Sequence, residues 1–185
     1  MEMSIHDACP ARTEERVHSA IRKLLEKWRW LVVTAYFYEF EIGKIGIAEK
    51  DGKITNLYFE NDELPKDLLI CETSVLKEAA RQLKSYLAGE LKEFSLPLAP
   101  AGTDFMKKVW TNLCEIPYGK TATYKEIAEK IGSPKAARAV GLANNRNSIP
   151  IFIPCHRVIG ADGSLTGYRG GLELKKRLLN LEKGK

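Results

Sequence analysis

The chain contains 185 residues, a length that suits one ordinary domain or two small ones. Hydrophobic residues make up 44% of it and charged residues 29%, proportions that exclude disordered and collagen-like proteins. The net charge of +5 is uneven, with 15 Lys and Arg against 7 Asp and Glu in residues 99–185 and 14 against 17 in residues 1–98. A basic second half favours contact with a polyanion there, although an asymmetric solvated surface fits the charge equally well.

The N-terminus and the cysteines bear on the compartment. The first residues are polar and acidic, unlike a signal peptide, and no apolar run approaches the roughly 20 residues that span a bilayer. We therefore expect a cytoplasmic protein, nuclear in a eukaryote, that does not engage a membrane. Without a secretory route, the four cysteines are expected to be free thiols, and because none forms a CxxC pair no zinc site is expected. These are Cys9, Cys71, Cys114 and Cys155.

The first half predicts a small α/β unit. Apolar spacing predicts an amphipathic helix over Thr13–Trp28 and another over Ser74–Leu87. Between them, β-branched and aromatic residues predict a strand over Trp30–Phe40. Two further strands, Ile42–Ala48 and Ile54–Phe59, flank Asp51-Gly52, a pair suited to a tight hairpin turn. No chemical constellation stands out, so we interpret this half as scaffold.

A proline-containing segment, residues 93–102, marks the boundary between the halves. Directly after it, Thr103 is placed to cap a helix with Phe105, Val109, Trp110 and Leu113 on its inward face.

Two short helices separated by a turn follow. Thr123 and Glu126 fit a capping box at the start of the first. Ser133-Pro134 is expected to start the second, Lys135–Asn144, with Ser as N-cap and Pro in the first turn. A helix, a short turn and a basic helix with small side chains are typical of a DNA-binding helix-turn-helix. A helical hairpin that merely packs is the alternative.

The segment Pro154-Cys155-His156-Arg157 carries the strongest chemical signal. A thiol beside His and Arg is expected to have a lowered pKa, and the thiolate is the nucleophile. An inert buried cysteine is the alternative. A cysteine protease is disfavoured because protease partners lie far apart in sequence, and because it would not explain the helix-turn-helix.

Pro154-Cys155-His156-Arg157-Val158 resembles the active-site signature of the O6-alkylguanine-DNA alkyltransferases. The resemblance runs from about Thr103 to Glu182 and includes Ile116–Gly119, Thr123-Tyr124, Ala137–Gly141, Asn147, Gly167-Tyr168 and Gly170–Leu172. It implies an α/β N-terminal RNase H-like domain, residues 1–98, as scaffold. A mainly α C-terminal domain with a winged helix-turn-helix, residues 99–185, would bind DNA and accept the alkyl group.

The resemblance also implies roles for catalytic residues. Cys155 would accept the alkyl group irreversibly in a single turnover, activated by a relay of water, His156 and Glu182. Tyr124 would give a proton or hydrogen bond to guanine N3 as the base leaves. Asn147 would brace the helix-turn-helix against the active-site segment.

Recognition of DNA follows from the same resemblance. The partner would be double-stranded DNA, contacted in the minor groove, with the O6-alkylguanine flipped out and Arg138 filling its place. Other DNA contacts are expected from Lys135, Ala136, Ala137, Ala139, Asn144 and Arg146. The guanine pocket is expected from Pro150, Val158, Tyr168 and Arg169. Arg169 departs from the serine of some members, and Asn144 replaces an apolar residue.

The expected function is therefore direct-reversal DNA repair by a monomer, with no cofactor and no metal. A non-catalytic helix-turn-helix regulator is one alternative. A lesion-binding alkyltransferase-like protein is another, but such proteins carry tryptophan at the acceptor position, where this chain has Cys155.

Overall fold

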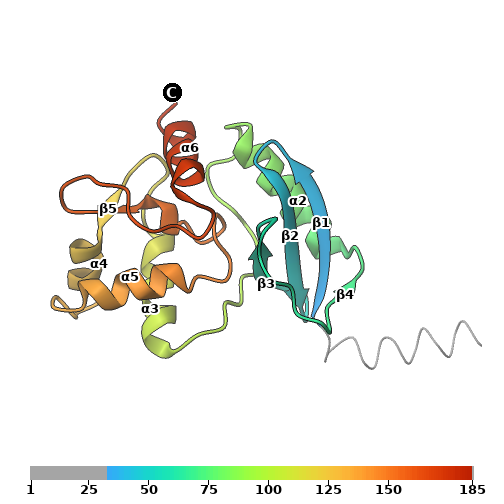
Figure 1. Ribbon diagram of the computed structural model, residues 1–185, viewed down its shortest axis with the longest axis horizontal. Helices are drawn as coiled ribbons and strands as arrows, with labels where there is room; N and C mark the ends of the chain where they lie inside the picture. Colours follow the sequence, from blue (N-terminus) through green and yellow to red (C-terminus); the bar gives the residue numbers. More distant parts are fainter. Residues whose placement is uncertain (1–32, 185) are drawn as a thin grey trace, which may run out of the picture.

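The computed structural model describes residues 33–184 and has two lobes (Figure 1). One lobe consists of a sheet and helix α2, and the other contains helices α3 to α6. The helix predicted over residues 13–28, the first residues of the strand predicted from Trp30, and Cys9 lie outside the described residues. Within residues 33–184, no helix combines the length and apolar character that crossing a bilayer requires.

The first lobe is a four-stranded sheet in the order β3-β2-β1-β4. Strands β1 (Thr34–Phe40), β2 (Gly43–Lys50) and β3 (Lys53–Tyr58) are antiparallel, and the short β4 (Leu69–Ile70) runs parallel to β1. Asp51 (φ 54°) and Gly52 (φ 72°) both adopt positive φ, so the predicted tight turn is confirmed.

Helix α2 (Ser74–Leu87) has the predicted bounds. Thr73 caps it by accepting a hydrogen bond from the Leu76 amide, and its buried side chains, such as Leu83, join those of β2 in the core. The helix therefore closes one face of the sheet.

The outer edge of β3 is covered by segments of the chain from outside the sheet. The Ile54 amide donates to Pro97 O (2.8 Å), and Ile54 O accepts from the Ala99 amide (2.8 Å). Further along the edge, the Leu57 amide donates to Ser148 O (2.8 Å) and the Ser148 hydroxyl donates to Thr55 O (3.0 Å). The connection between the lobes and the loop before Cys155 are thus both fastened to this strand.

The second lobe contains the predicted pair of short helices. Its elements are α3 (Asp104–Cys114), β5 (Ala122–Thr123), α4 (Tyr124–Lys130), α5 (Ala137–Asn145), the 3-10 helix η1 (Cys155–Arg157), β6 (Val158–Ile159) and α6 (Leu172–Glu182). Thr103 caps α3 as predicted, and Thr123 and Glu126 form the predicted capping box of α4.

The start of the second short helix was predicted wrongly. Helix α5 begins at Ala137 rather than Lys135, and Ser133 makes no side-chain cap. The Ala136 amide donates instead to Ser133 O at 2.8 Å. Residues 133–136 therefore form a turn, for which Ser-Pro is as well suited as for a helix start.

One hydrophobic core crosses both lobes. Ile45 of β2, Leu83 of α2, Trp110 of α3 and Leu178 of α6 all belong to the same buried cluster, and Cys155 lies in it too. The Trp110 indole donates from Nε1 to Ala143 O at 2.9 Å, which ties α3 to α5.

Candidate active site

Cys155 lies at the start of η1 with only 5% of its surface exposed. Asn147 holds the segment that leads to it. Its Nδ2 donates to Ile153 O (3.0 Å) and to Cys155 Sγ (3.2 Å), while its Oδ1 accepts from the Ile149 amide (3.0 Å). Between these points Ile151 has a φ of 72°, a conformation that a β-branched residue adopts only when its surroundings enforce it. Asn147 therefore braces both the loop and the sulfur.

The thiol environment differs from the sequence prediction. Burial raises the pKa of Cys155 to about 11, against the opposing effects of the Asn147 hydrogen bond and the positive charge of Lys175. The lowered pKa was expected because His156 and Arg157 are neighbours in sequence. Both side chains instead turn toward Glu182. The resting thiol is therefore protonated at neutral pH and needs a base to give it up.

The Glu182 carboxylate accepts hydrogen bonds from several polar groups of this core. Its Oε1 lies 2.8 Å from His156 Nε2, and its Oε2 accepts from Arg157 Nε (2.9 Å) and from the Gly119 amide (3.0 Å). Burial alone would raise the pKa of Glu182, but the hydrogen bonds from His156 and Arg157 lower it to about 2. An ionised carboxylate only accepts hydrogen bonds, so the proton of a neutral His156 sits on Nε2.

His156 is consequently suited to act as a base. Burial is the main cause that lowers its pKa, which keeps the imidazole neutral near pH 7. Its Nδ1 is buried and has no hydrogen-bond partner among the described residues. A neutral ring with Nε2–H bound to a carboxylate leaves the Nδ1 lone pair free to receive a proton.

Two residues of this site, Lys175 and Tyr86, were not singled out from the sequence, and Arg157 was singled out only as a neighbour of the thiol. The Arg157 guanidinium donates to Ile116 O at 2.6 Å as well as to Glu182, so it orders the carboxylate and not the thiol. Lys175 is buried and donates to Val158 O (2.7 Å) and Thr166 O (2.8 Å). Tyr86 of α2 donates to Glu182 Oε1 at 2.6 Å, and nothing in its sequence neighbourhood pointed to this contact.

The helix-turn-helix presents a basic exposed face. Arg138 and Ala139 of α5 are exposed, as are Lys135 before the helix and Arg146 after it, while Ala136 and Ala137 are half-buried. Asn144 was predicted to join this face, but it is buried on the inner side of α5 with Val140 and Ala143. Both polar atoms of its amide lack a hydrogen-bond partner among the described residues. A contact of Asn144 with an exposed ligand is therefore not supported.

A cavity of about 420 Å³ adjoins the exposed face of α5. The Tyr124 ring lies against Gly141, where an added Cβ would come within 3.7 Å of it. The Tyr124 hydroxyl accepts a hydrogen bond from Thr166 Oγ1 at 3.0 Å, so its own proton remains free to be donated. The cavity is lined by Tyr124, Ala137, Arg138, Gly141, Asn145, Thr166 and Gly167.

The four predicted pocket residues occupy different positions. Pro150 and Val158 are buried. Tyr168 packs edge-on against Phe59 and His156, and its buried hydroxyl has no partner among the described residues. The Arg169 guanidinium pairs with Asp62 at 2.7 and 3.2 Å, which ties the loop before α6 to the sheet lobe.

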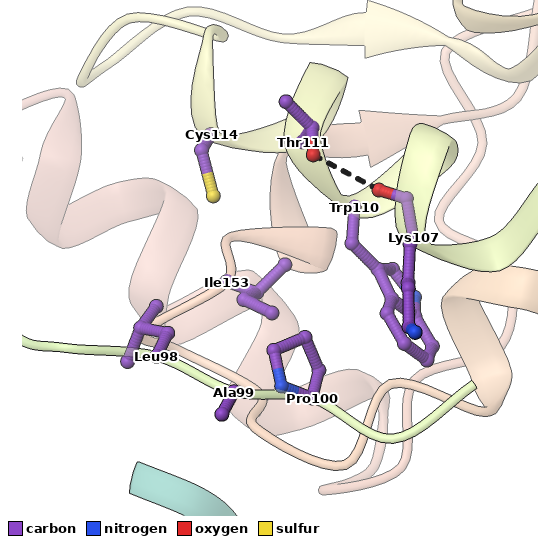
Figure 2. Close-up of a pocket in the computed structure, with 8 residues that line it drawn as sticks. All are labelled: Leu98, Ala99, Pro100, Lys107, Trp110, Thr111, Cys114 and Ile153. Carbon is purple, nitrogen blue, oxygen red and sulfur yellow. Dashed lines mark hydrogen bonds between the residues drawn. The ribbon is translucent and has the colours of Figure 1, made fainter. Parts of the chain in front are cut away.

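A second cavity, of about 450 Å³, lies between α3 and the connection between the lobes (Figure 2). Its walls come from Leu98, Ala99, Pro100, Lys107, Trp110, Thr111, Cys114 and Ile153. It contains neither Cys155 nor the groups around Glu182, so it is separate from the candidate site. Among residues 33–184, no three His, Cys, Asp or Glu side chains gather as a metal site would require.

Both lobes of the chain are similar to known proteins. Residues 33–100 match the family model described as the ribonuclease-like domain of 6-O-methylguanine DNA methyltransferase, and residues 104–184 match the DNA binding domain of the same family. A methylated-DNA–protein-cysteine methyltransferase of Methanosarcina barkeri is 56% identical over 148 residues, which is 78% of this chain and 93% of the relative. A constitutive enzyme of that name from Bacillus subtilis is 49% identical over 152 residues, covering 78% and 92%.

A solved structure is similar over the same range. The crystal structure of Mycobacterium tuberculosis OGT in complex with DNA superposes with a TM-score of 0.77 at 46% identity, covering 82% of this chain and 93% of that one. The resemblance and the two-part fold predicted from the sequence are therefore confirmed.

Proposed function

Because the chain belongs to the 6-O-methylguanine DNA methyltransferase family, we propose that it repairs DNA by moving the methyl group of O6-methylguanine onto Cys155. The observation that carries this assignment is a buried thiol followed directly in the chain by a histidine that is hydrogen-bonded to a buried carboxylate. The Cys155 sulfur accepts a hydrogen bond from Asn147, and His156 bonds Glu182 through Nε2 and keeps an Nδ1 without a hydrogen-bond partner among the described residues. A nucleophile, a base and an orienting carboxylate are the parts that such a transfer needs.

The proposed reaction balances without a cofactor. The thiol proton of Cys155 passes through a bridging water to His156 Nδ1, and Glu182 stabilises the imidazolium that results. The sulfur attacks the methyl carbon, the S–C bond forms and the C–O6 bond breaks. Guanine leaves as an anion, to which Tyr124 donates a proton or hydrogen bond at N3, lowering the barrier. The products are S-methylcysteine and unmodified guanine, so each molecule acts once.

The proposed DNA contact uses the exposed face of α5 in the minor groove. The target carbon is buried in a duplex, so the nucleotide must be flipped out of the stack. The Arg138 guanidinium forms no ion pair with any described residue, which leaves it available to fill the vacated place. Lys135 and Arg146 are exposed nearby and would contact phosphates.

The division of labour follows the two lobes. We assign residues 99–185 to DNA binding and alkyl acceptance and residues 1–98 to the supporting α/β domain. The protein is expected to act as a monomer on DNA, which light scattering of the complex with a short duplex would test.

The decisive experiment is intact-mass analysis after incubation with a duplex that contains O6-methylguanine. We expect the protein to gain one CH₂ unit and the modified peptide to contain Cys155. Cys155→Ser should bind the duplex but gain no mass, whereas the matched control Cys114→Ser, altered at an exposed cysteine, should gain it normally. Binding without any mass change in the wild-type protein would identify a regulator or lesion-binding protein instead.

A further inference from the structure

Tyr86 connects the sheet lobe to the catalytic groups. It lies in α2, within the half that the sequence indicated to be scaffold, and its side chain is completely buried. Its hydroxyl donates to Glu182 Oε1 at 2.6 Å and lies 3.3 Å from His156 Nε2. A phenol at these distances contacts both members of the relay on which the proposed function rests.

We propose that Tyr86 is a positioning residue for methyl transfer: by its hydrogen bond to Glu182 it orients the imidazole of His156. This inference depends on the proposed function and adds to it a contribution from the N-terminal domain.

The geometry explains why a hydroxyl is needed at this point. Glu182 is also gripped by Arg157, whose guanidinium contacts both carboxylate oxygens. The Tyr86 hydroxyl supplies a donor to Oε1, the oxygen that faces His156. The Nε2–H of His156 then lies between two acceptors, Glu182 Oε1 and the Tyr86 oxygen. Two acceptors fix the plane of the ring, and with it the direction of the Nδ1 lone pair.

The Tyr86 ring is itself fixed by packing. It lies against Phe94, with ring centroids 5.0 Å apart, and meets Tyr118 edge-on at 6.1 Å. Removing only the hydroxyl leaves these contacts in place, so the effect on the relay can be separated from an effect on the core.

Tyr86→Phe tests the inference, with Tyr118→Phe as its matched control. The Tyr118 hydroxyl donates to Leu181 O at 3.5 Å and makes no hydrogen bond to Glu182. In single-turnover transfer from an O6-methylguanine duplex, we expect Tyr86→Phe to be slower by about tenfold, as for the loss of a hydrogen bond to a charged group, and Tyr118→Phe to stay within about twofold of wild type. Equal rates for wild type and Tyr86→Phe would overturn the inference.

The pH profile adds a readout that packing alone would not move. With one donor fewer, Glu182 attracts the imidazolium proton more strongly, so the acid limb of the rate profile should move to higher pH in Tyr86→Phe. An acid limb at the same pH in Tyr86→Phe and in the wild-type protein would contradict the positioning role of Tyr86. The ionisable groups that surround the ring in the described residues are Glu182 and Lys175 from α6, Arg157 from η1, Tyr168 from the loop before α6, and Tyr86 itself.

A double-mutant cycle separates action through Glu182 from an independent effect. In a Glu182→Gln background, Tyr86→Phe should change the residual rate by less than about twofold, and a full effect there would refute the coupling. If Tyr86→Phe does not fold, the wild-type protein still provides a test by NMR. The Tyr86 hydroxyl proton should exchange slowly and show a nuclear Overhauser effect to the His156 ring, and the absence of that contact would overturn the inference. A wild-type protein that transfers no methyl group would instead overturn the proposed function.

Discussion

Replacing Asn147 with alanine should be among the most damaging single changes in the active-site loop. The amide makes three hydrogen bonds, to the Ile149 amide, to Ile153 O and to Cys155 Sγ. Two of the three lie within the turn that holds Ile151 at positive φ. Asn147 itself is 1% exposed, so water does not replace the lost partners.

The magnitude follows from what each partner loses. The Ile149 amide has no other acceptor among the described residues and would become an unsatisfied buried donor, which costs about 1–3 kcal/mol. Ile153 O keeps its hydrogen bond from the Cys155 amide at 2.8 Å and loses only the second, about 1 kcal/mol. Asn147→Ala should therefore lower the free energy of unfolding by about 3 kcal/mol.

Urea unfolding followed by tryptophan fluorescence measures this change. Asn112→Ala is the matched control, because that amide lies on the exposed side of α3 and donates only to Lys108 O one turn earlier; its cost should stay within about 0.5 kcal/mol. A difference between the two variants of less than about 1 kcal/mol would show that the three hydrogen bonds do not brace the loop.

Two further predictions concern titration and DNA. Burial raises the pKa of Cys155 from 9.0 to about 11, so the folded state holds the thiol proton more tightly than the unfolded state does. The contribution of this thiol to the free energy of unfolding is therefore complete below pH 9 and should fall as the pH rises toward 11. Between pH 8 and pH 11, the midpoint of urea unfolding should fall less in Cys155→Ser than in the wild-type protein. An equal fall in both proteins would show that the raised pKa of Cys155 does not cause the loss of stability. Arg138→Ala should slow methyl transfer from duplex DNA far more than reaction with free O6-benzylguanine, since only the duplex requires base flipping. Single-turnover rates with both substrates measure this, and equal losses would refute the role of Arg138.

Features with a local cause were predictable from the sequence. The Asp51-Gly52 turn and the Thr123–Glu126 capping box depend on residues within a few positions of each other, and both are confirmed. The start of α5 was predicted wrongly, because Ser133-Pro134 is equally compatible with a turn and with a helix N-terminus. Local propensity does not choose between two structures that share the same first residues.

The direction of the catalytic side chains depends on contacts far apart in the chain. His156 and Arg157 follow Cys155 directly, yet both reach toward Glu182, more than 20 residues later. The prediction of a lowered thiol pKa failed because proximity in sequence was taken for proximity in space. Tyr86 gave no signal at all, since a buried tyrosine on an amphipathic helix is indistinguishable from ordinary core until the fold brings its hydroxyl to Glu182.

The covering of the β3 edge has a consequence for dividing the protein. The backbone groups of Ile54 and Leu57 at the outer edge of β3 form hydrogen bonds with Pro97, Ala99 and Ser148. Without these partners they would be unpaired at the edge of the sheet. A chain cut between its lobes would lose the partner supplied by Ser148 and expose the apolar surface on both sides of the shared core. An exposed edge strand can pair with strands of other chains. The two separated lobes should therefore aggregate rather than behave as two independent soluble domains.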